Sequence, residues 1–191
     1  MPLPTVGDLN WLAALEHPAL LAPVTYAALV AWATAEPRVA EEVAVAAIDP
    51  ALADTAALTA AHQLPVMISV NCVVVTGKRG GVERVAAAAV RADTRADVNN
   101  VLKRLLDVRK ASFMPLEQAV AQSGMEYGGI TPIGLPPSWR VLIDQGAATR
   151  GLALIGSGIR GSKLLLPDDL LARYPGAEVI EGLAYVPIEA P

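Results

Sequence analysis

The 191-residue chain contains few cysteine, histidine or aromatic residues, and it has no long apolar run. Its single cysteine, Cys72, cannot form an internal disulfide, and its two histidines do not suggest a metal site of three or four ligands. No apolar segment reaches the roughly 20 residues that cross a membrane, and no basic and then apolar leader is present. We therefore expect a cytoplasmic protein that spans no membrane and binds neither a metal nor a cofactor.

Hydrophobic residues make up 53% of the sequence and charged residues 18%, which argues against disorder and is enough to build the core of one domain. The net charge is −4, but residues 78–110 hold nine Lys or Arg against four Asp or Glu. Such a basic segment is compatible with a nucleic-acid backbone as partner. It is equally compatible with a solvated helix face.

The first forty residues have a helical pattern that proline interrupts. Trp11 begins an apolar helix face, and Pro18 and Pro23 break that helix. We expect residues 1–40 to form a helical extension that packs on the main domain, residues 41–191. Its hydrophobic residues would also allow weak self-association.

The rest of the chain alternates strand and helix patterns irregularly. Strands are expected at residues 43–48, 66–76, 82–91, 140–143, 152–155, 163–166 and 178–180, with a hairpin turn at residues 77–81. Helices are expected at residues 51–62, after a Thr94 cap over residues 98–106, from Pro115 to Gly124, and after Pro167. This order predicts an α/β or α+β domain, in which helices flank a mixed, largely antiparallel central sheet.

Residues 124–136 are the most informative segment, with four glycines and two prolines in thirteen positions. Such a segment forms neither a helix nor a central strand. A stiff loop without side chains can direct its backbone N–H groups at a carbonyl, carboxylate or phosphate. A tight surface turn is the alternative.

A second glycine segment, residues 156–161, matches the dinucleotide-binding pattern letter by letter. The pattern needs a helix directly afterwards, whereas residues 163–166 read as a strand, so we expect a turn that holds Arg160 beside a pocket. Cys72 lies within a strand and is expected to be an inert thiol. No Gly-x-Ser-x-Gly elbow or serine, histidine and carboxylate set is present.

Taken in order, six segments resemble the YbaK / prolyl-tRNA-synthetase-associated editing domain family. They are residues 71–75, 91–97, 109–112, 124–136, 141–144 and 156–166. The resemblance covers roughly residues 41–183. It implies a freestanding deacylase that hydrolyses the ester of a mischarged aminoacyl-tRNA, so the implied partner is the aminoacylated CCA end of tRNA.

The resemblance also implies which residues form the site. Water would attack the ester with help from the ribose hydroxyl of the substrate, and backbone donors would stabilise the oxyanion, at roughly 3–4 kcal/mol per donor. The implied catalytic residues are Gly128, Gly129 and Asn71, the implied substrate-binding residues are Ile130, Thr131, Pro132, Gly156, Ser157 and Gly158, and possible tRNA contacts are Arg109, Lys110, Arg160 and Lys163. A bulkier residue at position 129 is expected to abolish turnover without unfolding the protein.

One position departs from the family pattern. Asn71 stands where the family has a lysine, and asparagine can donate a hydrogen bond but carries no charge. Lys110 and Lys163 are the alternatives for a charged group in the pocket. Two hypotheses follow: an active editing deacylase, or an impaired relative that binds an aminoacyl-adenosine-like ligand or a protein partner.

Overall fold

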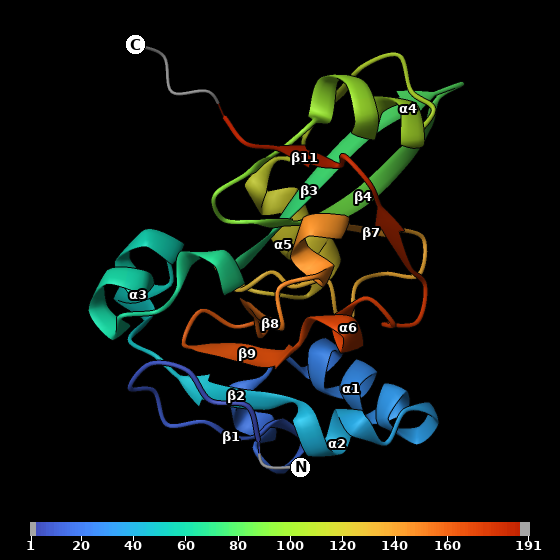
Figure 1. Cartoon of the computed structure of the whole chain (residues 1–191). Coiled ribbons are helices and arrows are strands. Elements are labelled where there is room, and N and C mark those ends of the chain that lie inside the picture. Colours follow the sequence, from blue (N-terminus) through green and yellow to red (C-terminus); the bar gives the residue numbers. More distant parts are fainter. Residues whose placement is uncertain (1–2, 188–191) are drawn as a thin grey trace.

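Two β-sheets carry the fold of the protein in a computed structural model that describes residues 3–187 (Figure 1). The first is antiparallel throughout and contains, in spatial order, β1 (Leu12–Ala13), β2 (Ala44–Ala47), β9 (Ser162–Pro167) and β8 (Leu152–Gly156). The second contains β10 (Ala177–Ile180), β7 (Arg140–Asp144), β4 (Val82–Arg91), β3 (Val70–Arg79) and β6 (Ala111–Phe113). A ribbon of β5 (Arg95–Ala96) and β11 (Ala184–Tyr185) completes the strands. The mixed α/β class is confirmed, with two main sheets in place of one central sheet.

The β3–β4 hairpin is the longest paired element, with ten residues in each strand. β4 is buried in its middle, where the four alanines of residues 86–89 are 0% exposed because hydrophobic clusters cover both faces of the sheet. Alanine favours helices in isolation, so packing and not local propensity sets this strand. Beyond β4 the sheet is parallel, since β4 pairs with β7 and β7 with β10 in that sense.

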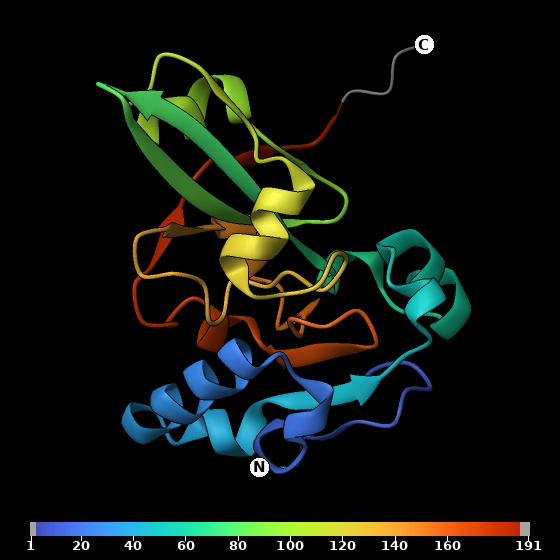
Figure 2. The same cartoon turned by 180° about the vertical axis from the view of Figure 1, so that it is seen from behind.

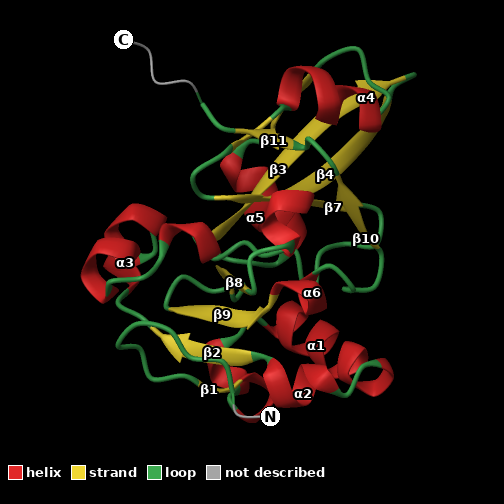
Figure 3. Ribbon diagram, viewed as in Figure 1, coloured by secondary structure: helices red, strands yellow, loops and turns green. Residues whose placement is uncertain are grey.

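Helices flank the two sheets (Figure 3). They are α1 (Pro23–Ala35), α2 (Arg38–Glu42), α3 (Thr55–His62), α4 (Lys103–Leu105), α5 (Leu116–Ser123) and α6 (Asp168–Leu171). A π-helical turn, Val98–Leu102, precedes α4, and short 3₁₀ helices occur at Ala14–Glu16, Pro18–Leu20, Pro50–Leu52, Val66–Ile68 and Gln145–Ala148. Seen from behind, α5 lies against the β3–β4 hairpin (Figure 2), where its Ala119 packs with Val74 and Ala87. Within residues 3–187, no helix is long and apolar enough to cross a membrane.

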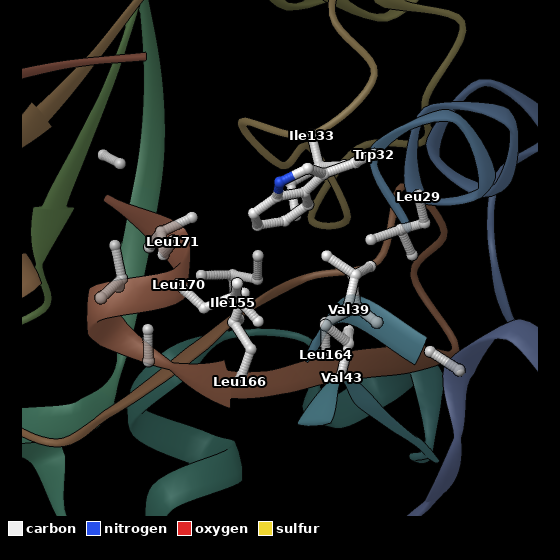
Figure 4. Close-up of a cluster of buried hydrophobic side chains, with 14 of the residues drawn as sticks. Leu29, Trp32, Val39, Val43, Ile133, Ile155, Leu164, Leu166, Leu170 and Leu171 are labelled. Atoms are coloured by element: carbon white, nitrogen blue, oxygen red, sulfur yellow. The ribbon is translucent and has the colours of Figure 1, made fainter. Parts of the chain in front are cut away.

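The amino-terminal segment contributes to the main core. Leu29 and Trp32 of α1 are buried among residues of β8, β9 and α6 (Figure 4), and the Trp32 ring meets Tyr174 edge to face at 5.3 Å. β1 pairs with β2, and α2 spans the boundary that we expected at residue 40. Arg38 of α2 donates to both Glu42 and Asp169, which ties the segment to α6.

The helix expected from Trp11 is wrong, because Leu12–Ala13 form strand β1 and only a 3₁₀ turn, Ala14–Glu16, follows it. Two further predictions are wrong at their boundaries. The strand expected at residues 66–76 begins only at Val70 and continues to Arg79, because the chain reverses at Gly80 and Gly81, whose positive φ angles of 58° and 81° form the turn. The helix start expected at Thr94 lies at Asp97, whose carboxylate accepts from the Asn100 N–H.

Candidate functional site

A cavity of about 940 Å³ opens between α3, α5 and the beginning of β3. It exists because β6 pairs with β3 only at Val75, Thr76 and Gly77, and the next hydrogen bond, from the Met114 N–H to the Val74 carbonyl, is the last one on this edge within residues 3–187. Residues 70–73 of β3 therefore keep one backbone edge unpaired, and all four line the cavity. The two glycine segments close its other side. This volume is typical of a small-molecule site, and we call it the main pocket.

Six of the residues expected at the site line the main pocket. They are Asn71, Gly128, Ile130, Gly156, Arg160 and Lys163. The N–H groups of Gly128 and Ile130 have no acceptor within residues 3–187, so they are free to bind a ligand. Seven expected residues do not line the pocket: Gly129, Thr131, Pro132, Ser157, Gly158, Arg109 and Lys110.

Gly129 lies where the two glycine segments meet. Its N–H donates to the Glu126 carbonyl at 3.0 Å, and its own carbonyl accepts from the Gly158 N–H at 2.8 Å. A Cβ atom at this position would lie 2.4 Å from the Ile159 carbonyl oxygen. The N–H of Gly129 is therefore not a free donor. In place of the earlier expectation, we now expect a bulkier residue at this position to disturb the fold.

The second glycine segment is closed on the side that faces away from the pocket. A Cβ atom on Gly158 would lie 2.4 Å from the Ala22 Cβ and 2.6 Å from the Thr25 Oγ1. Ser157 is 0% exposed, and its Oγ lies 2.7 Å from that of Ser162. Ser157 and Gly158 therefore support the pocket wall from the side that faces away from the cavity, and they do not line the cavity itself.

Asn71 is held in one orientation by helix α3. The Thr55 hydroxyl donates to Asn71 Oδ1 at 2.8 Å, and Thr55 is itself the first residue of α3, behind the Asp54 cap. No residue in the described part of the chain accepts from the Asn71 Nδ2 group. Because Thr55 fixes the amide oxygen of Asn71, the N–H₂ group of the same side chain remains as a donor at the pocket wall.

Lys163 is the buried cation of the main pocket. Its side chain reaches from β9 to the Ala53 carbonyl, where Nζ donates at 3.1 Å, and the residue is only 8% exposed. Loss of hydration lowers the pKa of this ammonium group, although the nearby Asp54 carboxylate opposes the shift. An ammonium group has three donors, so two remain for a ligand.

Arg160 forms the rim of the pocket. Its Nε donates to the Pro50 carbonyl at 2.8 Å, and its guanidinium carbon lies 5.3 Å from the centre of the Tyr127 ring. Its backbone N–H donates to the Glu126 carboxylate at 2.7 Å. Arg160 therefore connects three loops around the pocket entrance. This agrees with the expectation that the second glycine segment holds Arg160 beside a pocket.

Cys72 was expected to be a buried, inert thiol, but it is only partly buried and lines the main pocket. Cys72 packs with Val74, Met114 and Trp139, and loss of hydration raises the pKa of its thiol to about 12. A thiol of this kind stays neutral near pH 7 and is a poor nucleophile. Within residues 3–187, no three His, Cys, Asp or Glu residues gather closely enough to hold a metal ion.

Sequence reasoning missed three residues that shape the pocket. Thr55 fixes Asn71, while the exposed rings of Phe113 and Tyr127 stand at the rim with 61% and 60% of their surfaces exposed. Phe113 is the only phenylalanine of the chain, and an aromatic residue in a short strand between polar segments was the signal that could have identified it.

Comparison with known proteins gives one family match and several structures of similar fold. The model of the aminoacyl-tRNA editing domain family matches residues 49–174, and no curated protein matches the chain. Among solved structures, a hypothetical protein is 19% identical with a TM-score of 0.70, covering 83% of this chain and 99% of its own. A protein provisionally described as a trans-editing enzyme for prolyl-tRNA synthetase is also 19% identical, with a TM-score of 0.66 and coverage of 84% and 97%. These likenesses establish the fold.

Proposed function

The chain belongs to the aminoacyl-tRNA editing domain family, and from this premise we propose that it hydrolyses the ester of a mischarged aminoacyl-tRNA. The observation that carries the proposal is the main pocket, where free donors gather and the one thiol, that of Cys72, stays neutral near pH 7. The donors are the N–H groups of Gly128 and Ile130, the Asn71 amide and the Lys163 ammonium group. Such donors stabilise an oxyanion that forms within their reach.

The reaction needs no covalent intermediate on the protein. Water adds to the ester carbonyl carbon with help from the neighbouring ribose hydroxyl, and the negative charge develops on the carbonyl oxygen. The tetrahedral species then breaks its bond to the ribose oxygen, which leaves with a proton and gives the free amino acid and tRNA. A neutral Cys72 and the lack of a histidine in the pocket fit this route.

Lys163 supplies the positive charge that Asn71 lacks. A lysine on β9 and a lysine at the start of β3 would reach the same cavity from opposite walls, because residues of both strands line it. The low hydration of Lys163 strengthens its interaction with a developing negative charge. Lys110, the other alternative, does not line the pocket.

The test is release of amino acid from alanyl-, seryl-, cysteinyl- and threonyl-tRNA by the purified protein. We expect one substrate to be hydrolysed well above the rate in buffer. Glu41→Gln, an exposed change on α2 outside the pocket, is the control and should keep the wild-type rate. A flat time course on all four substrates would overturn the proposal.

The impaired relative remains the second candidate, because the Asn71 oxygen is already occupied by Thr55. Asn71→Lys separates the two. A large gain in deacylation supports an activity that the natural protein has lost, whereas a further loss supports a site rebuilt around asparagine and Lys163.

A further inference from the structure

A second cavity of about 480 Å³ adjoins the main pocket. The two cavities share Asn71, Val73 and Phe113 as a common wall. The second cavity adds residues from β5, the loop after it and β11, and we call it the side pocket. A ligand that fills the main pocket can therefore continue past Asn71 into the side pocket.

The lining of the side pocket combines exposed rings with a free cation. Phe113 and Tyr185 are 61% and 52% exposed. Aromatic side chains usually bury most of their surface, so two exposed rings at one cavity are unusual. Arg95 faces Tyr185 across the β5–β11 ribbon, where the two residues are register partners. Within residues 3–187, no carboxylate lies at ion-pair distance from the Arg95 guanidinium group.

Asp97 adds an acceptor to this lining. Its carboxylate already caps the π-helical turn by accepting from the N–H and the side-chain amide of Asn100. A carboxylate has about four acceptor positions, so it can also accept from a ligand. The side pocket thus offers stacking surfaces, one cation and one acceptor.

These groups match one nucleotide of single-stranded RNA. Exposed rings stack on bases of any kind, and a guanidinium group binds a phosphate. A carboxylate accepts from the exocyclic amine of cytosine. An amino acid side chain fits the side pocket less well, because small apolar groups are better covered in the main pocket by Val74, Met114 and Ala119.

We propose that the side pocket binds the cytidine that precedes the terminal adenosine of the CCA end. The inference rests on the proposed function, since it assumes that the main pocket holds the aminoacyl-adenosine. Phe113 and Tyr185 stack on the cytosine, Asp97 accepts from its amine, and Arg95 meets the phosphate that joins it to the adenosine.

Equilibrium binding of uncharged RNA fragments to the full chain tests this subsite without requiring catalysis. The probes are adenosine, the dinucleotide CpA and the dinucleotide UpA, titrated calorimetrically or by NMR. We expect CpA to bind about 10-fold more tightly than adenosine, in line with stacking of one base, and more tightly than UpA, because uracil has a carbonyl group where cytosine has its amine. Arg95→Ala and Tyr185→Ala should erase the difference between CpA and adenosine. Arg104→Ala, an exposed arginine of α4 outside both pockets, is the control.

The inference fails if CpA binds no more tightly than adenosine, if CpA does not bind at all, or if both side-pocket variants leave the CpA affinity unchanged. Equal binding of UpA and CpA would overturn the cytidine assignment. Failure of the deacylase proposal looks different, because it leaves CpA binding intact while every mischarged tRNA stays uncleaved.

Discussion

The two faces of the paired glycine segments are built differently. On the rear face, Gly129 and Gly158 contact backbone and α1 so closely that no side chain fits, and their N–H groups are bonded within the protein. On the pocket face, Gly128 is exposed and its N–H is free among the described residues. Neighbouring glycines therefore differ in role. Gly129 and Gly158 allow close packing behind the pocket wall, whereas Gly128 keeps its N–H group available as a donor.

The largest expected effect on stability comes from adding a methyl group on the rear face of the glycine segments. Gly129→Ala places a Cβ atom 2.4 Å from a backbone oxygen that cannot rotate away, and we expect it to lower the free energy of unfolding by about 4 kcal/mol. Gly128→Ala meets the end of the Arg160 side chain at 2.9 Å and a φ of +78°, which costs only about 1–2 kcal/mol. Urea unfolding followed by circular dichroism measures both, and equal losses would contradict the difference between the faces.

A change on the pocket face should affect activity more than stability. Lys163→Met removes a proposed oxyanion donor, and we expect kcat/KM for deacylation to fall about 100-fold. The midpoint of unfolding should stay close to that of the wild type, because the methionine fills the same space without a poorly hydrated charge. Lys103→Met on α4 is the control. A parallel loss of activity and stability would mean that Lys163 only holds the Ala53 loop.

The pH dependence of Lys163 follows from its lowered pKa. In the window between the folded-state pKa and the ordinary lysine pKa of 10.5, the unfolded chain binds more protons, so the stability attributable to this group rises with pH. Activity should fall through the same window as the ammonium group loses its proton. Lys163→Met should show neither trend, which unfolding and rate measurements at alkaline pH would test.

The smallest expected effect concerns the Arg38 ion pairs, which tie α2 to α6. The Arg38 hydrogen bonds lower the pKa of Glu42 below its ordinary value of 4.5. A lowered carboxyl pKa contributes stability that is present above the unfolded value and lost as pH falls through the folded value. Glu42→Gln should therefore weaken the acid dependence of the melting temperature, while Glu41→Gln, at an exposed neighbour, should not. Identical acid profiles for wild type and Glu42→Gln would show that this ion pair adds nothing to the anchoring.

Much of the fold was predictable because local signals and packing agree. Pro115 and Gly124 bracket α5 as expected, and short runs of consecutive apolar residues locate β7, β8 and β9. The boundary errors have a physical cause: Gly77 stays within β3 because Val108 and Lys110 pack against it, a contact from more than thirty residues away. Strand ends set by distant contacts leave no local signal.

The candidate site was predictable in part. The glycine segments, Arg160 and the position of Asn71 followed from the sequence, and all contribute to the pocket wall. The roles within each segment did not, because Thr131 and Ser157 have the polar groups of a binding residue but lie buried at 0% exposure. A hydroxyl group in such a loop can point into the pocket or into the protein core. Which of the two it does depends on how the whole loop packs, and the local sequence does not determine this.

By itself, the sequence determined the family, the order of most elements and a pocket wall made of glycine loops with no nucleophile. Only the tertiary structure decided that Lys163, and not Lys110, is the pocket cation, and that Thr55 holds Asn71 in place. The physical reason is distance along the chain. Glycine, proline and apolar spacing act over a few residues, whereas the Lys163–Ala53 contact joins groups 110 residues apart, which only packing of the sheets and α3 brings together.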